Sequence, residues 1–180
     1  IAAAHDDTWG GFGGAPKFPP AMALDFLLAV RATAAAERAR GWPARLDEIV
    51  NTTARAMAHG GIYDQFGGGF SRYSVDGQWL IPHFEKMLYD NAQLSSASAI
   101  AAAHFGRPDY ARIARQTLDF WLRDMASEEC ALYSTLDADS EGAEGKYYVW
   151  TLQNIHEALP TPDDAALLIE HFGITPSGNW

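Results

Sequence analysis

The stretch from Gly60 to Leu94 reads GGIYDQFGGGFSRYSVDGQWLIPHFEKMLYDNAQL and carries most of the chemically useful side chains of the sequence. It starts with five glycines in ten residues, a density that lets the backbone adopt positive φ values and approach a ligand or another loop closely. The glycine spacing matches neither the dinucleotide-binding pattern nor the P-loop pattern, so no phosphate loop is predicted. We expect a long loop, followed by a helix that begins at Pro82.

The segments around this stretch predict helices that pair as hairpins. Helix-forming residues and apolar side chains at helical spacing predict helices over residues 21–40, 44–59 and 82–104, and a fourth from Pro108 onward. The pattern then changes, because ALYSTLDAD (131–139) and KYYVW (146–150) are typical of strands and the turn-rich SEGAEG separates them. We expect a small β-hairpin near residues 130–150, then helices that begin after Thr151 and Thr161.

Length, charge and cysteine content exclude several classes of protein. The 180 residues and 48% hydrophobic content suit one core, so we expect a single domain over residues 1–180. A formal charge of −10 argues against a nucleic-acid partner, because such a partner needs clustered Lys and Arg. The single cysteine, Cys130, excludes an internal disulfide and suits a reducing compartment, so we expect a cytoplasmic protein. No apolar run reaches the roughly 18 residues of a membrane span.

Four motifs in order resemble one known family. They are GGFGGAPKFP (10–19), the Gly60 to Leu94 stretch, DADS (137–140) and EGKYYVWT (144–151). Together they resemble the thioredoxin-domain-containing family that includes the spermatogenesis-associated thioredoxin-like protein. The resemblance implies a mainly α fold, the early part of an (α/α) toroid of the six-hairpin glycosidase and sugar-epimerase type. The chain holds about half of the helices of such a toroid, so we expect a fragment of a larger one.

The resemblance also limits what can be inferred about chemistry. In that family a thioredoxin-like domain precedes the toroid, but this chain has no CxxC pair, so no redox activity is carried over. We expect no cofactor. Asp137 to Gly142 imitates the start of an EF-hand loop, but the residue at loop position 12 is Tyr148 instead of Glu, so no metal site is predicted.

The glycine loop supplies the first candidate site residues. Asp64 is a candidate catalytic carboxylate, with the capping of a turn as its alternative role. Tyr63, Tyr73 and Trp79 are candidate substrate-binding residues, because their rings offer flat faces to a sugar. We expect Phe66 to lie in the core instead.

The segment PHFEKMLYDN (82–91) supplies the second set. His83 is a candidate general acid or base, the role that histidines have in sugar epimerases of this fold, and Asp90 is a candidate catalytic carboxylate. Glu85 and Tyr89 are candidate substrate-binding residues. On a regular helix from Pro82, His83 and Asp90 lie within about 20° of each other, while Glu85 points about 160° away from His83. The alternative roles are a helix-dipole contact for Glu85 and an i,i+4 pair between Lys86 and Asp90.

The expected hairpin tip supplies the last candidates, Asp139 as a catalytic carboxylate and Asp137 as a substrate-binding residue, since glycoside hydrolysis uses paired carboxylates. The alternative is a solvated acidic turn.

Two functions follow from these patterns. One is a carbohydrate-active toroid that works by acid/base chemistry as an epimerase, hydrolase or lyase on a small-molecule carbohydrate. The other is a non-catalytic binding or scaffold domain for the upstream thioredoxin-like domain. We expect a homodimer to cover helix faces that a partial toroid leaves exposed.

Overall fold

The computed structural model describes residues 1–179, apart from the side chains of residues 34 and 36. It divides into two compact units, the first over Ile1–Ala138 and the second from Asp139 onward. The first unit is built around helices, as predicted. Its helices are η1 (Ala2–Ala4), α1 (Ala21–Arg31), α2 (Ala34–Arg38), α3 (Trp42–His59), α4 (Leu88–Phe105) and α5 (Pro108–Asp124).

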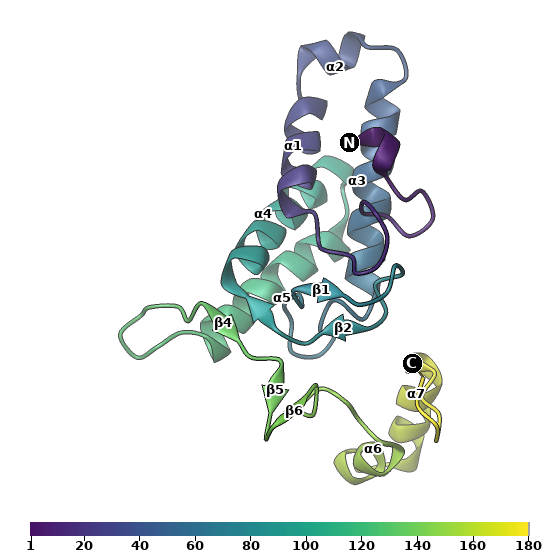
Figure 1. The fold of residues 1–180 in the computed structure, drawn as a ribbon, viewed down its shortest axis with the longest axis vertical. Coiled ribbons are helices and arrows are strands. Elements are labelled where there is room, and N and C mark those ends of the chain that lie inside the picture. Colours follow the sequence, from purple (N-terminus) through teal and green to yellow (C-terminus); the bar gives the residue numbers. More distant parts are fainter. Residues whose placement is uncertain (180) are drawn as a thin grey trace. The chain divides into compact units, whose positions relative to one another are not determined.

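The helices of the first unit bury one large apolar core, and Phe120, Trp121 and Met125 form a smaller second cluster. Helix α1 packs against α3 and α4, and α4 forms a tight hairpin with α5 (Figure 1). Helices α1, α3, α4 and α5 contribute side chains to the large core at helical spacing, such as Leu46, Ile49 and Val50 from α3 and Tyr110 and Ile113 from α5, all at most 3% exposed. Gly106 follows α4 in the left-handed conformation that is typical of glycine at the end of a helix.

Helix α4 begins at Leu88, six residues later than predicted from Pro82. The backbone ahead of it is already used in strand pairing. Strand β2 (Pro82–His83) pairs with β1 (Tyr73–Ser74), and β3 (Lys86–Met87) pairs with β4 (Thr135–Leu136). These antiparallel ladders require extended backbone, and an extended residue cannot also belong to a helix.

The second unit contains the small β-hairpin expected near residues 130–150. Its strands are β5 (Asp139–Ser140) and β6 (Ala143–Glu144), joined through Glu141 and Gly142. The KYYVW run is not a strand, because the N–H groups of Tyr148 and Val149 both donate to the carbonyl of Gly145 in a turn. The hairpin is therefore shorter than the sequence indicated and occupies only residues 139–144 of the expected range.

Two capped helices follow, α6 (Leu152–Ala158) and α7 (Pro162–Phe172). The Thr151 and Thr161 hydroxyls accept from the N–H groups of Asn154 and Asp164, which confirms both predicted N-caps. No helix among residues 1–179 is long and apolar enough to cross a membrane. The single domain over residues 1–180 stays a prediction, because hairpins of one toroid can form separate compact units.

A buried ion pair fixes the glycine loop to the helices. Lys86 is 1% exposed, and its ammonium donates to the Asp64 carboxylate and to the carbonyl of Gly68, both at 2.8 Å. The same ammonium lies 4.2 Å from the centre of the Phe120 ring on α5. Burial lowers the pKa of Lys86, and the Asp64 carboxylate opposes this shift. The predicted pair between Lys86 and Asp90 is wrong, since Lys86 lies in β3 and faces the loop.

Replacing Lys86 by Met should destabilise the protein by about 3–5 kcal/mol, because it leaves a carboxylate and a carbonyl without their buried donor. Chemical denaturation measures this change. Lys146→Met is the matched control, since it removes the ammonium of an exposed ion pair with Glu141. Equal midpoints for the two variants would show that the buried pair does not hold the loop.

Candidate functional site

A narrow strip of strands carries the candidate site on its outer face. Lys17 pairs with Ser74 next to the β1–β2 ladder, with both backbone hydrogen bonds at 2.8 Å. Lys17 and Ser74 are fully buried, whereas Tyr73 and His83, which face each other in the ladder register, are only half-buried. Successive residues of a strand point to opposite faces, so the pairing that buries Lys17 and Ser74 turns Tyr73 and His83 outward.

Three rings contact one another along this outer face, of which His83 and Tyr73 are stacked and Phe18 is tilted. The imidazole of His83 lies on the ring of Tyr73, with centres 4.7 Å apart and planes inclined by 13°. The ring of Phe18, which is 53% exposed, lies 4.9 Å from the ring of Tyr73. Tyr73 therefore orients His83, and the stack presents an aromatic surface beside the polar groups described next.

Glu85 lies between His83 and Arg72. Its Oε2 accepts from Arg72 Nη1 at 2.8 Å and lies 3.9 Å from His83 Nε2. The carbonyl of Glu85 also accepts from the backbone N–H of Arg72 at 2.8 Å. The expected angle of about 160° between His83 and Glu85 applied only to a regular helix from Pro82, and it does not hold here because the helix begins at Leu88. Nor does Glu85 contact the helix dipole, since its partner is Arg72.

Asp90 joins this cluster from the first turn of α4. Burial raises the pKa of Asp90 to about 6, with a further contribution from the Glu85 carboxylate, while Arg72 acts in the opposite direction. Tyr89 is 49% exposed and, after Glu85, contributes to the raised pKa of Arg72. We call His83, Glu85, Arg72, Asp90 and Tyr89 the His83 cluster. It contains one imidazole, two carboxylates and one guanidinium. These groups can accept or donate protons and form hydrogen bonds with a polar ligand.

Asp64 lies apart from this cluster in a structural role. Its Oδ1 accepts from the N–H groups of Phe66 and Gly67 at 3.0 and 2.8 Å, and its Oδ2 accepts from Lys86. This is the turn-capping role that the sequence left open for Asp64. The same turn carries Phe66 outward, 75% exposed, so the prediction that Phe66 lies in the core is wrong.

Two of the aromatic candidates belong to the core. Tyr63 is 1% exposed, its hydroxyl donates to Gln116 Oε1 at 3.0 Å, and burial raises its pKa to about 12. Trp79 is fully buried and its indole N–H donates to the carbonyl of Trp9 at 2.8 Å. Neither ring offers a face to a sugar in this structure. Their polar atoms instead tie the glycine loop and residues 1–12 to the core.

The acidic candidates near the hairpin are exposed. Asp137 is at the end of the first unit, and Asp139 begins β5 in the second unit. Each belongs to a different unit, so their part in the site stays a prediction. Within residues 1–179, no group of three or more His, Cys, Asp or Glu side chains is arranged to hold a metal ion.

Two residues of this face, Arg72 and Phe18, were not predicted from the sequence. Arg72 lies between β1 and the glycine loop. Its position as a lone basic residue near several candidate acids was the feature of the sequence that could have indicated it. Phe18 follows the buried Lys17, and pairing with a segment some 57 residues later in the chain brings it to Tyr73. Contacts over that sequence separation leave no local periodic pattern.

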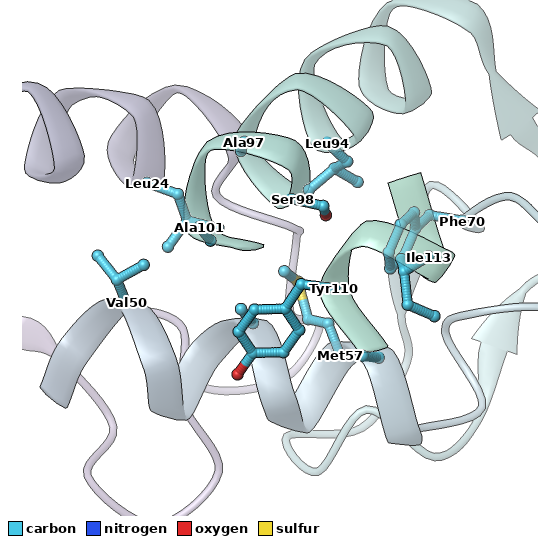
Figure 2. Close-up of a pocket in the computed structure, with 12 residues that line it drawn as sticks. Leu24, Val50, Met57, Phe70, Leu94, Ala97, Ser98, Ala101, Tyr110 and Ile113 are labelled. Carbon is cyan, nitrogen blue, oxygen red and sulfur yellow. The ribbon is translucent and has the colours of Figure 1, made fainter. Parts of the chain in front are cut away.

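A small cavity of about 10 Å³ lies among the helices of the first unit, away from the His83 cluster (Figure 2). Leu24 from α1, Val50 and Met57 from α3, Leu94 from α4 and Ile113 from α5 line it. It holds at most one water molecule, and its lining is almost entirely apolar. The cavity is therefore an imperfection of core packing.

Solved structures with the same arrangement of elements define the class of fold. A sugar epimerase from a ruminal bacterium matches 86% of this chain and 42% of its own, with a TM-score of 0.64 at 15% identity. The cellobiose 2-epimerase of Spirochaeta thermophila matches 97% of this chain and 50% of its own, with a TM-score of 0.62 at 19% identity. The fold is that of a partial (α/α) toroid of the six-hairpin, epimerase-like class, as predicted.

Sequence relatives then identify the family. Spermatogenesis-associated protein 20 of Homo sapiens is 39% identical over 97% of this chain, and that of Mus musculus is 40% identical. An uncharacterized protein of Caenorhabditis elegans is 33% identical over the same share of the chain. This similarity over nearly the whole chain confirms the resemblance to the spermatogenesis-associated protein 20 proteins. The chain spans about a quarter of the length of these relatives, 24% in the human protein. No protein-family model matches the chain.

Asp90→Asn should stabilise the protein at pH 7–8 by on the order of 1 kcal/mol, after allowance for solvent screening. The raised pKa means that the charged carboxylate is disfavoured in the folded state. Wild-type stability should therefore increase, relative to the variant, as the pH falls through about 6 towards the ordinary value of 3.8. Thermal melts from pH 4 to pH 8 measure the difference. A difference between the two proteins that does not change with pH would contradict this environment for Asp90.

Proposed function

We propose that the His83 cluster is the acid/base site of a carbohydrate-active toroid, with His83 as the proton-transfer group. The position of the imidazole is the main support for this proposal. It lies between the Tyr73 ring, 4.7 Å from centre to centre, and the Glu85 carboxylate at 3.9 Å, and 24% of the His83 side chain is exposed. An imidazole in such a place can accept and return a proton near neutral pH. The fold shared with sugar epimerases supports a sugar as the ligand, as an analogy only.

The neighbouring groups have distinct parts in this proposal. Glu85, whose carboxylate lies 3.9 Å from the imidazole, orients it. Asp90, with a pKa of about 6, is divided between the acid and the carboxylate near neutral pH and can therefore donate or accept a proton. Arg72 and Tyr89 offer hydrogen-bond donors to sugar oxygens, and Phe18 offers an apolar surface to a sugar ring.

Proton transfer at a sugar carbon next to a carbonyl is the reaction class that these groups suit best. One base removes the proton, and a guanidinium or hydroxyl stabilises the oxygen on which negative charge develops. Epimerisation is therefore the reaction that we propose first, ahead of hydrolysis or elimination. We do not include Asp64 among the catalytic residues, because its carboxylate already accepts hydrogen bonds from three donors.

The alternative proposal is a non-catalytic binding domain beside a thioredoxin-like domain. One observation favours it. Exposed apolar side chains lie one helical turn apart on α1, with Met22 75% and Phe26 54% exposed, as on a surface that binds protein. A second copy of the chain is the partner that we predict for this surface.

His83→Gln in the full-length protein should reduce turnover of aldoses and disaccharides by at least about 100-fold, because it removes the base and keeps the size of the side chain. Product analysis by NMR in D₂O measures turnover and detects solvent deuterium at the reacting carbon. His59→Gln, at an exposed histidine at the end of α3, is the matched control and should keep wild-type turnover. Absence of turnover by the wild type across a broad panel would favour the binding domain instead.

A further inference from the structure

The charges of the His83 cluster carry an inference about its ligand, and it rests on the proposed function. Arg72 is its one guanidinium, with 41% of the side chain exposed, and it lies where it could bind the carboxylate or phosphate of an acidic sugar. Glu85 already accepts a hydrogen bond from this guanidinium at 2.8 Å. An anionic ligand would have to compete with a carboxylate that the chain itself supplies.

The backbone holds Glu85 in this competing position. The N–H of Arg72 donates to the carbonyl of Glu85 at 2.8 Å, next to the β1–β2 ladder. The following residue, Lys86, is anchored in the core by Asp64 and by the carbonyl of Gly68. Glu85 therefore needs no ligand to place it, and a ligand that displaced it would leave its carboxylate without its cationic partner.

The second carboxylate increases the negative charge. Asp90 lies in the first turn of α4, five residues after Glu85. The charges of Arg72, Glu85 and ionised Asp90 sum to −1 when His83 is neutral. The whole chain has a formal charge of −10, which adds a repulsive field of the same sign.

We infer that Glu85 is a specificity-determining residue, which neutralises Arg72 so that the site takes uncharged or amine-bearing sugars and rejects sugar acids and sugar phosphates. The hydroxyls of an uncharged sugar can hydrogen-bond with the carboxylates and the guanidinium while the ion pair stays intact. An amine-bearing sugar adds a cation, which the excess of carboxylates attracts. Exclusion of the wrong ligand by a like charge is a common source of specificity.

Calorimetric titration of the full-length protein with D-glucose, D-glucosamine, D-glucuronate and D-glucose 6-phosphate tests this inference. Wild type should bind glucuronate and glucose 6-phosphate at least about tenfold more weakly than glucose. Glu85→Gln should lower this discrimination by about tenfold or more, because the guanidinium becomes free to bind the anion.

Two further variants separate the pair from a general charge effect. Asp109→Asn changes the protein charge by the same amount as Glu85→Gln. It also removes the two hydrogen bonds, of 2.9 and 2.6 Å, through which Asp109 binds Arg107. It should leave the discrimination between glucose and the anionic sugars unchanged. Arg72→Gln combined with Glu85→Gln should remove the gain of anion binding. Circular dichroism shows whether each variant is folded.

Two results would overturn the inference alone. One is wild-type affinity for an anionic sugar equal to or above that for glucose. The other is unchanged discrimination in the Glu85→Gln variant. Absence of binding of all four sugars to the wild type would overturn the proposed function together with the inference.

Discussion

The buried ammonium of Lys86 is the constraint on which the rest of the first unit depends. An ammonium in the core needs acceptors, and it finds them in the Asp64 carboxylate and the carbonyl of Gly68. This requirement folds the glycine loop onto the helices. Gly68 has a φ of +82°, and a Cβ there would lie 2.5 Å from the carbonyl oxygen of Gln116, so only glycine allows the approach. Lys17 is a second buried ammonium of this kind, and it donates to the Asp6 carboxylate and to the carbonyls of Gly10 and Gly77.

The candidate site follows from these two anchors. Lys17 pairs with Ser74 and fixes one side of the strip, while Lys86 lies immediately after Glu85 and fixes the other. With both lysines turned into the core, strand alternation directs Tyr73 and His83 outward. The stacked imidazole and the Arg72–Glu85 pair are thus arranged by groups that never meet a ligand. The helices belong to the epimerase-like fold, and the two buried lysines fix the positions of the strands that carry the site.

Much of the fold could be predicted from the sequence, because helix periodicity, the N-caps Thr151 and Thr161 and the glycine stop at Gly106 are local signals. The site could be predicted only in part. His83 and Asp90 stood out by residue type, but the start of α4 at Leu88 depends on pairing between Lys86–Met87 and a strand almost fifty residues later. Long-range pairing of two-residue strands leaves no pattern in the sequence. For the same reason the sequence alone could not show that Glu85 lies near His83, or that Arg72 belongs to this face.

Under the proposed function, the face that carries His83 and Tyr73 is the surface that binds a sugar. NMR of the histidine and tyrosine ring signals of the full-length protein, recorded during titration with D-glucose and cellobiose, tests this. We expect saturable shifts of the His83 and Tyr73 signals with a common dissociation constant, while signals of the buried Tyr63 and Tyr110 rings stay in place. Saturable shifts confined to other histidines and tyrosines, or no shift of His83 at any sugar concentration, would contradict it.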